Sequence, residues 1–276
     1  MNPFTSAALN WYASAIWLGY LLLTVWITRV RRNNAAPPST RQQQYEHALV
    51  GALLLLHTPF AFAPLTQALP HFGAREALGL LTWLSVLIYW TAAFMIRLEG
   101  LQTVLLPVAT VTLAASQLLP PGHPTPWLSA TLMQVHFAIA MLSYGFFSVA
   151  AGLAALMRLA DRDLHHPAQG LLRQLPPLLA LEKLLFSTLA LGFTLLTATL
   201  ITGTVFAEEL FGRAITWNHK TIFSLCAWLV FGTLIWGRQT RGWRGRTAIN
   251  WTLIGFALLL LAYIGNRFVL DSLIRR

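Results

Sequence analysis

Three histidines fall within or at the start of long apolar stretches of the sequence, namely His57, His136 and His219. An ionisable side chain is costly at membrane depth and marks a functional site by default. Two neutral imidazoles on facing helices can hold a haem iron from both sides, and apolar, aromatic surroundings suit a porphyrin. A lone imidazole can equally hydrogen-bond a backbone carbonyl or a threonine of the next helix. Residues 183–206 contain six threonines, so both interpretations stay open at this point.

Trp217 and Arg267 are further candidates for a cofactor site. Arg267 lies near the outer end of the last apolar stretch, where a guanidinium would pair with a haem propionate or extend to lipid headgroups. Trp217 lies near an expected membrane interface, where tryptophans are common. No string typical of a P-loop, a dinucleotide fold, a serine hydrolase or a zinc protease occurs, so we expect no enzyme. The chain has no CxxCH attachment motif, so any haem would be non-covalent haem b.

Helices in a membrane must position these side chains, because the composition excludes a soluble globule. Of the 276 residues, 56% are hydrophobic and only 10% are charged, against about 25% charged residues in an average soluble domain. The mean hydropathy of +0.60 agrees with this. The single cysteine, Cys226, excludes an intramolecular disulfide and a cysteine-based metal site. We therefore predict an all-α integral membrane protein.

Eight apolar segments are each about long enough to cross a hydrocarbon core roughly 30 Å thick. They predict a bundle of about eight transmembrane helices that forms one compact membrane domain. Residues 1–128 would make an N-terminal four-helix segment, and residues 129–276 a four-helix core. The expected spans are residues 6–28, 46–65, 77–96, 101–119, 129–159, 183–206, 218–237 and 248–270.

The arginines predict the orientation of the bundle. The odd-numbered loops contain 12 arginines, whereas the even-numbered loops and the C-terminal tail contain 4. Basic loops face the cytoplasm, so this bias places both termini outside, in the periplasm of a bacterial cytoplasmic (inner) membrane. His136 and His219 then belong to the outer half of the membrane, and His57 lies near the midplane. The net charge of +10 indicates contacts with anionic membrane lipids, and we expect no nucleic acid partner.

The second half of the chain resembles the cytochrome c assembly protein family, the group of the CcsA, CcmC and HemX proteins. The resemblance covers residues 132–270, and the first four spans are similar in length and layout to its YpjD/HemX-like branch. It implies haem as a ligand, with His136 in the place of the family's outer histidine. The matching strings are LMQVH at 132–136, MLSY at 141–144, GFTLLT at 192–197, TG at 202–203, WNHKT at 217–221, AWLVF at 227–231 and GWRGR at 242–246.

The chain departs from the haem-lyase members of that family in the loop before residue 219. Those members carry a tryptophan-rich WWD segment there, whereas residues 206–218 are short and contain one tryptophan, Trp217. Trp236 stands where the family has a histidine within the following helix, and no second outer histidine occurs near the C-terminus. His136 is thus the one family ligand carried over directly. His219 would replace the missing partner from the same membrane side, and His57 is the competing candidate.

From these observations we expect a membrane protein that binds and handles haem near the outer leaflet, with binding rather than catalysis as its activity. Its partners would be membrane lipids, haem, and cytochrome c maturation proteins or other membrane proteins. The alternative is a non-catalytic, HemX-like accessory or scaffold protein whose basic loops dock a cytoplasmic enzyme or a transporter. A solute permease is a weaker reading, because neither an inverted repeat nor a pair of broken helices is evident.

Overall fold

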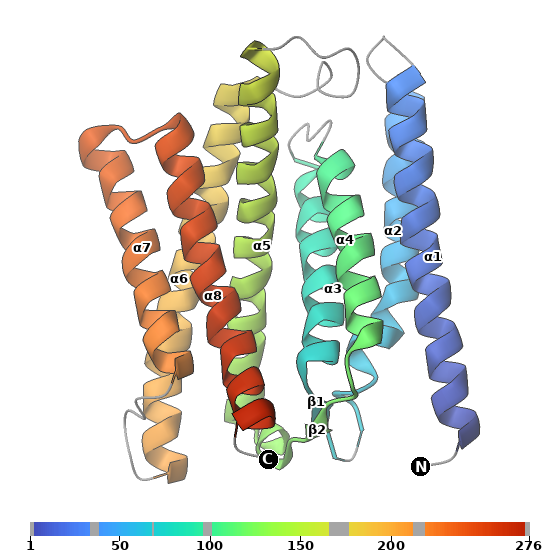
Figure 1. The fold of residues 1–276 in the computed structure, drawn as a ribbon, viewed down its shortest axis with the longest axis vertical. Helices are drawn as coiled ribbons and strands as arrows, with labels where there is room; N and C mark the ends of the chain where they lie inside the picture. Colours follow the sequence, from blue (N-terminus) through green and yellow to red (C-terminus); the bar gives the residue numbers. More distant parts are fainter. Residues whose placement is uncertain are drawn as a thin grey trace. The chain divides into compact units, whose positions relative to one another are not determined.

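The computed structural model describes residues 3–33, 39–67, 69–95, 101–165, 177–211 and 219–273. These residues form eight α-helices, and each expected span overlaps one of them (Figure 1). The helices are α1 (Pro3–Asn33), α2 (Thr40–Phe62), α3 (Ala74–Ala92), α4 (Gln102–Leu118), α5 (Thr131–His165), α6 (Leu178–Phe211), α7 (His219–Arg241) and α8 (Gly245–Leu273). The all-helical class predicted from composition is therefore confirmed.

Five helices of the described part are long and apolar enough to cross a membrane, judged by length and composition. These stretches are Trp11–Arg31, Thr131–Asp161, Leu178–Phe206, His219–Arg241 and Gly245–Ala262. Helix α4 is apolar but has only 17 residues, which span about 25 Å at 1.5 Å per residue. The number of crossings, expected to be eight, and the placement of both termini outside stay predictions.

The chain divides into two compact units, each described by itself. The first contains residues 1–126 and 159–177, and the second contains residues 127–158 and 178–276. The expected division after residue 128 into two halves of one membrane domain stays a prediction.

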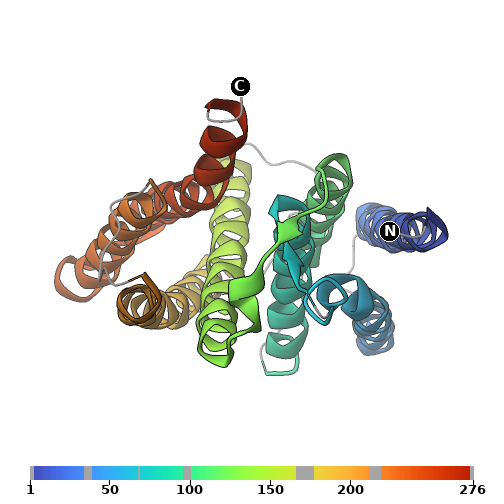
Figure 2. The ribbon, with the colours of Figure 1, turned by 90° about the horizontal axis from the view of Figure 1, so that it is seen from below.

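In the first unit α1 packs against both α2 and α4, and so does α3 (Figure 2). Short strands β1 (His71–Phe72) and β2 (His123–Pro124) pair antiparallel at one end of these helices. The Thr125 backbone N–H and its hydroxyl both donate to the carbonyl of Pro70, at 2.7 and 2.9 Å. The loop after α2 is thereby tied to the loop after α4.

In the second unit α7 packs against α6 and α8, and two aromatic rings join α5 to α7. Phe147 and Phe231 stack with ring centroids 3.9 Å apart. This packing requires Gly255 on α8, because a Cβ there would lie 2.6 Å from the Phe231 ring. Gly242 and Gly245 have φ of 65° and 53°, a conformation that favours glycine and lets α7 turn sharply into α8.

Candidate functional site

His136 lies in the second turn of α5, and three residues of α6 hold its ring. The ring Nδ1 lies 2.8 Å from the Thr202 hydroxyl. A Cβ at Gly203 would meet Cε1 of the ring at 3.2 Å, so the glycine makes room for the imidazole. Phe206 meets the ring edge to face, with centroids 6.1 Å apart. The structure shows no partner for Nε2 among the described residues, so this nitrogen is free to bind a ligand.

Two further residues at helical spacing from His136 on α5, Ser143 and Phe147, also contact α6. Ser143 donates to the carbonyl of Gly192 at 3.0 Å. A Cβ at Gly192 would meet the Phe147 ring at 3.2 Å. Small residues at these positions therefore let the two helices approach closely.

The threonines of α6 divide into two groups by their hydrogen bonds. Thr188, Thr194, Thr199 and Thr204 donate to carbonyls of their own helix in the described structure. Thr197 and Thr202 do the same but also contact a neighbouring helix, through Trp228 and His136. A hydrogen bond between a histidine and a threonine of the next helix, one of the two interpretations left open from the sequence, is therefore present, and it uses only one ring nitrogen.

His219 is the first residue of α7 and its side chain is exposed. Among the described residues, no hydrogen bond or ring contact links it to His136. Lys220, the next residue, is close enough for its charge to act on the His136 ring, so the start of α7 lies on the His136 side of this unit. Trp217 lies outside the described residues, and Arg267 lies on α8 with a side chain that is also outside them.

His57 belongs to the first unit, whereas His136 and His219 belong to the second. Its side chain is fully buried, with 0% exposed surface. Nδ1 lies 3.2 Å from the Tyr20 hydroxyl, and the two rings meet edge to face. Nε2 is buried without a hydrogen-bond partner among the described residues. A buried nitrogen of this kind needs an explanation, and a bound water or a bound iron would each provide one.

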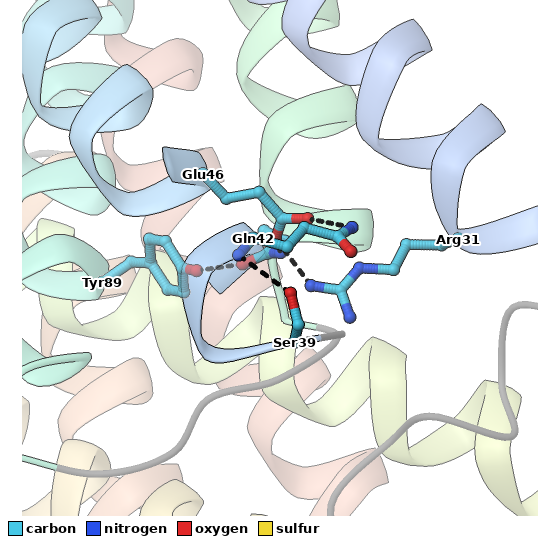
Figure 3. Close-up of polar contacts among 6 residues, drawn as sticks. Arg31, Ser39, Gln42, Glu46 and Tyr89 are labelled. Carbon is cyan, nitrogen blue, oxygen red and sulfur yellow. Dashed lines mark hydrogen bonds and ion pairs between the residues drawn. The ribbon is translucent and has the colours of Figure 1, made fainter. Parts of the chain in front are cut away.

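A buried polar network, which the sequence analysis did not find, joins all four helices of the first unit. Arg31 on α1 and Glu46 on α2 form an ion pair at 2.6 Å, and each side chain is only 3% exposed. Gln42 donates to the other Glu46 oxygen at 3.0 Å. Gln102 on α4 also donates to Glu46 and accepts from Tyr89 on α3. Figure 3 shows Arg31 and Gln42 beside Glu46, with Ser39 and Tyr89 at the edges of the cluster.

The second unit has its own ion cluster at the turn between α7 and α8. Glu182 lies 2.7 Å from Arg238 and 3.6 Å from Arg244. The Arg238 guanidinium also lies over the Phe186 ring, 4.8 Å from its centroid. Glu182 on α6 therefore pairs with arginines from both sides of the turn between α7 and α8.

The described histidines, cysteines, aspartates and glutamates form no group of three or more that could hold a bare metal ion. Among the described residues, His136 and His57 each have Nδ1 engaged and show no partner for Nε2, and Nε2 of His47 is likewise buried without a hydrogen-bond partner. Such donors fit haem, which supplies four ring nitrogens itself and takes one imidazole from each side.

Comparison with known proteins places the chain in a family. The family model described as Cytochrome C assembly protein matches residues 72–274. The chain belongs to the cytochrome c assembly protein family. The match begins at β1 rather than at residue 132, so it includes α3 and α4 as well as the segment that the sequence motifs indicated.

Two of the relatives named here match over most of the chain, and a third matches over about one third of it. Inner membrane protein YpjD of Escherichia coli strain K12 is 29% identical over 228 residues, covering 80% of this chain and 86% of YpjD. Cytochrome c biogenesis protein CcsA of Trieres chinensis is 27% identical over 234 residues, covering 72% of this chain and 75% of that protein. The CcsA of Gloeobacter violaceus is 34% identical over 93 residues, or 34% of this chain and 28% of that protein. No solved structure matches the chain. The similarity to an inner membrane protein and the membrane-length helices agree with the expected location in the bacterial inner membrane.

Proposed function

We propose that the chain binds haem b non-covalently with His136 as an axial ligand and handles it near the outer leaflet. The observation that carries this proposal is the His136 ring, which α6 holds through Nδ1 while the described residues provide no partner for Nε2. Membership of the cytochrome c assembly family supports haem as the ligand. When bound, haem would supply a redox-active iron. The chain itself would bind, orient and shield it, without catalysis.

The second axial ligand is proposed to be His219, which starts the helix that brings Lys220 near His136. Lys220 would also offer a cation to a propionate, as would Arg267 on α8. His57, in the first unit, stays the alternative ligand, and its buried Nε2 has no hydrogen-bond partner among the described residues. The proposal includes eight membrane crossings with both termini in the periplasm, which places His136 and His219 in the outer half.

The test is haem titration of the purified protein in detergent, followed by Soret absorbance. His136→Ala should lose the band or leave the iron five-coordinate, and His219→Ala should do the same. His57→Ala decides whether His219 or His57 is the second ligand. The Soret spectrum should stay unchanged if His219 is the ligand and should be lost if His57 is. His123→Ala is the matched control, since this exposed histidine takes part in none of these contacts.

A triple variant of His57, His136 and His219 that keeps the wild-type spectrum would contradict every form of this proposal. A wild-type protein without a Soret band would favour the accessory or scaffold function instead. In that case the bond between His136 and Thr202 would serve only to hold α5 against α6.

A further inference from the structure

We propose that Thr202 is a positioning residue for haem binding, which holds the His136 ring in the tautomer with a proton on Nδ1 and none on Nε2. This inference rests on the proposed function, in which Nε2 of His136 binds the iron. Neutral imidazole carries one proton, and only the nitrogen without it can bind a metal. The direction of one hydrogen bond therefore decides whether His136 is ready to act as a ligand.

The protons around Thr202 can be assigned by asking which arrangement satisfies every donor. The hydroxyl lies 2.8 Å from the Ala198 carbonyl and 2.8 Å from Nδ1 of His136. A hydroxyl has one proton to donate and two lone pairs to accept with. If it donates to Ala198, it accepts from Nδ1–H, and both donors are satisfied. If it donates to Nδ1 instead, the ring proton moves to Nε2, for which the described residues offer no acceptor. The Thr202 hydroxyl oxygen and the Ala198 carbonyl oxygen, 2.8 Å apart, would then face each other with no proton between them, so the first arrangement is preferred.

A second threonine on the same helix shows this arrangement with no ambiguity about direction. Thr197 donates to the carbonyl of Phe193 at 2.8 Å and lies 2.9 Å from the indole nitrogen of Trp228. An indole N–H can only donate, so the Thr197 hydroxyl accepts from it. Thr197 and Thr202 thus have the same kind of contacts, a carbonyl four residues earlier and an aromatic ring nitrogen on a neighbouring helix.

Two other residues of the same α6 turn limit the orientations that the His136 ring can adopt. Gly203 lies under Cε1 and Phe206 stands at the ring edge. A flipped ring would exchange Nδ1 for a carbon and lose the contact with Thr202. Partners of this kind fix both the tautomer and the orientation of a metal-binding histidine, and they raise the basicity of the ligand.

The first test reads the tautomer directly in haem-free protein by ¹⁵N NMR with labelled histidine, and His136→Gln identifies the signal. We expect a protonated Nδ1 and an unprotonated Nε2 in the wild type. Thr202→Val should give a mixture of tautomers, and Thr202→Ser should restore the single form. Thr199→Val is the matched control, because its hydroxyl bonds only its own helix in the described structure. A wild-type ring with its proton on Nε2 overturns the proposal, whether or not the protein binds haem.

The second test uses haem itself. Thr202→Val should weaken haem binding about 10–100-fold and raise the reduction potential of the bound haem, because the ligand becomes less basic. Thr202→Ser and Thr199→Val should keep wild-type values. Equal affinity and potential in Thr202→Val overturn the positioning role. If the wild type has the expected tautomer but binds no haem, the proposed function fails and the role of Thr202 in ligation fails with it, while the proton assignment stands.

Discussion

The Tyr20 hydroxyl lies 3.2 Å from Nδ1 of His57, and both side chains are completely buried between α1 and α2. The Tyr20 hydroxyl and the neutral His57 ring each carry one proton to donate, but the pair forms only one hydrogen bond, so it uses only one of these protons. Whichever group donates, Nε2 of His57 keeps no partner among the described residues. The contact differs from that of His136, where the threonine hydroxyl has a backbone carbonyl for its own proton.

A double-mutant cycle of Tyr20→Phe and His57→Leu should show coupling between the two side chains. Each single variant leaves one buried polar group unmatched, whereas the double variant removes both. The coupling should be about 0.6–1.7 kcal/mol, as interhelical hydrogen bonds in membrane proteins show. The measurement is the free energy of unfolding in detergent, with the exposed Tyr45→Phe as control. Strictly additive effects would mean that the contact contributes nothing.

Removing the charge of Glu46 should be among the more damaging single changes in the first unit. Glu46→Gln deprives the buried Arg31 guanidinium of its carboxylate, and breaking a buried pair in this way costs about 3–5 kcal/mol. The double variant Arg31→Met with Glu46→Leu should recover much of this loss, because it leaves no buried charge in the pair. Thermal unfolding of the purified protein measures both, with the exposed Arg41→Gln as control. A Glu46→Gln protein as stable as the wild type would refute this account.

The two arginines in the last turn of α7, Arg238 and Arg241, should not be equivalent, although the sequence analysis counts both in one basic loop. Arg238 pairs with the mostly buried Glu182 and is 24% exposed. Arg238→Gln should cost about 1–3 kcal/mol, between the values for exposed and buried pairs. Arg241 contacts the exposed Trp236 ring, so Arg241→Gln should cost less than about 1 kcal/mol. Equal unfolding temperatures for the two variants would show that the Glu182 pair adds no stability.

The orientation follows from the 12-to-4 arginine bias and is testable with reporter fusions. Fusions after Arg32, Arg162 and Arg241 should report cytoplasm, whereas fusions after His123 and Arg213 should report the periplasm. Reversed signals at the Arg32 and Arg241 fusions would mean that the bundle has the opposite orientation and that His136 and His219 lie in the cytoplasmic half of the membrane.

Most of the helices could be predicted because apolar stretches of membrane length leave little choice of structure. The α6-facing side of α5 was also predictable, since helical periodicity places His136, Ser143 and Phe147 on one face. The sequence suggested a hydrogen bond between a histidine and a threonine, but not which of the six threonines would form it, because periodicity does not distinguish among them. The packing of α5 against α6 determines that the partner of His136 is Thr202.

The network around Glu46 was missed because its members were judged one at a time. Arg31 was counted as a loop arginine and Glu46 was treated as the start of a span. A signal was present, however. Tyr20 and Arg31 are eleven residues apart, as are Glu46 and His57. If the first two spans form an antiparallel hairpin, one pairing implies the other. Glu182 gave no such signal, since Arg238 and Arg244 lie more than fifty residues away.

The matched spacing on α1 and α2 also limits how related chains can change in length. One residue inserted between Tyr20 and Arg31, or between Glu46 and His57, would rotate one side chain of that interval by about 100° around its helix. Either the contact between Tyr20 and His57 or the ion pair between Arg31 and Glu46 would then be lost. An insertion between residues 32 and 45 changes neither spacing. During divergence of this family, we expect gains and losses of residues to accumulate in that connecting stretch, while the two eleven-residue intervals keep their length.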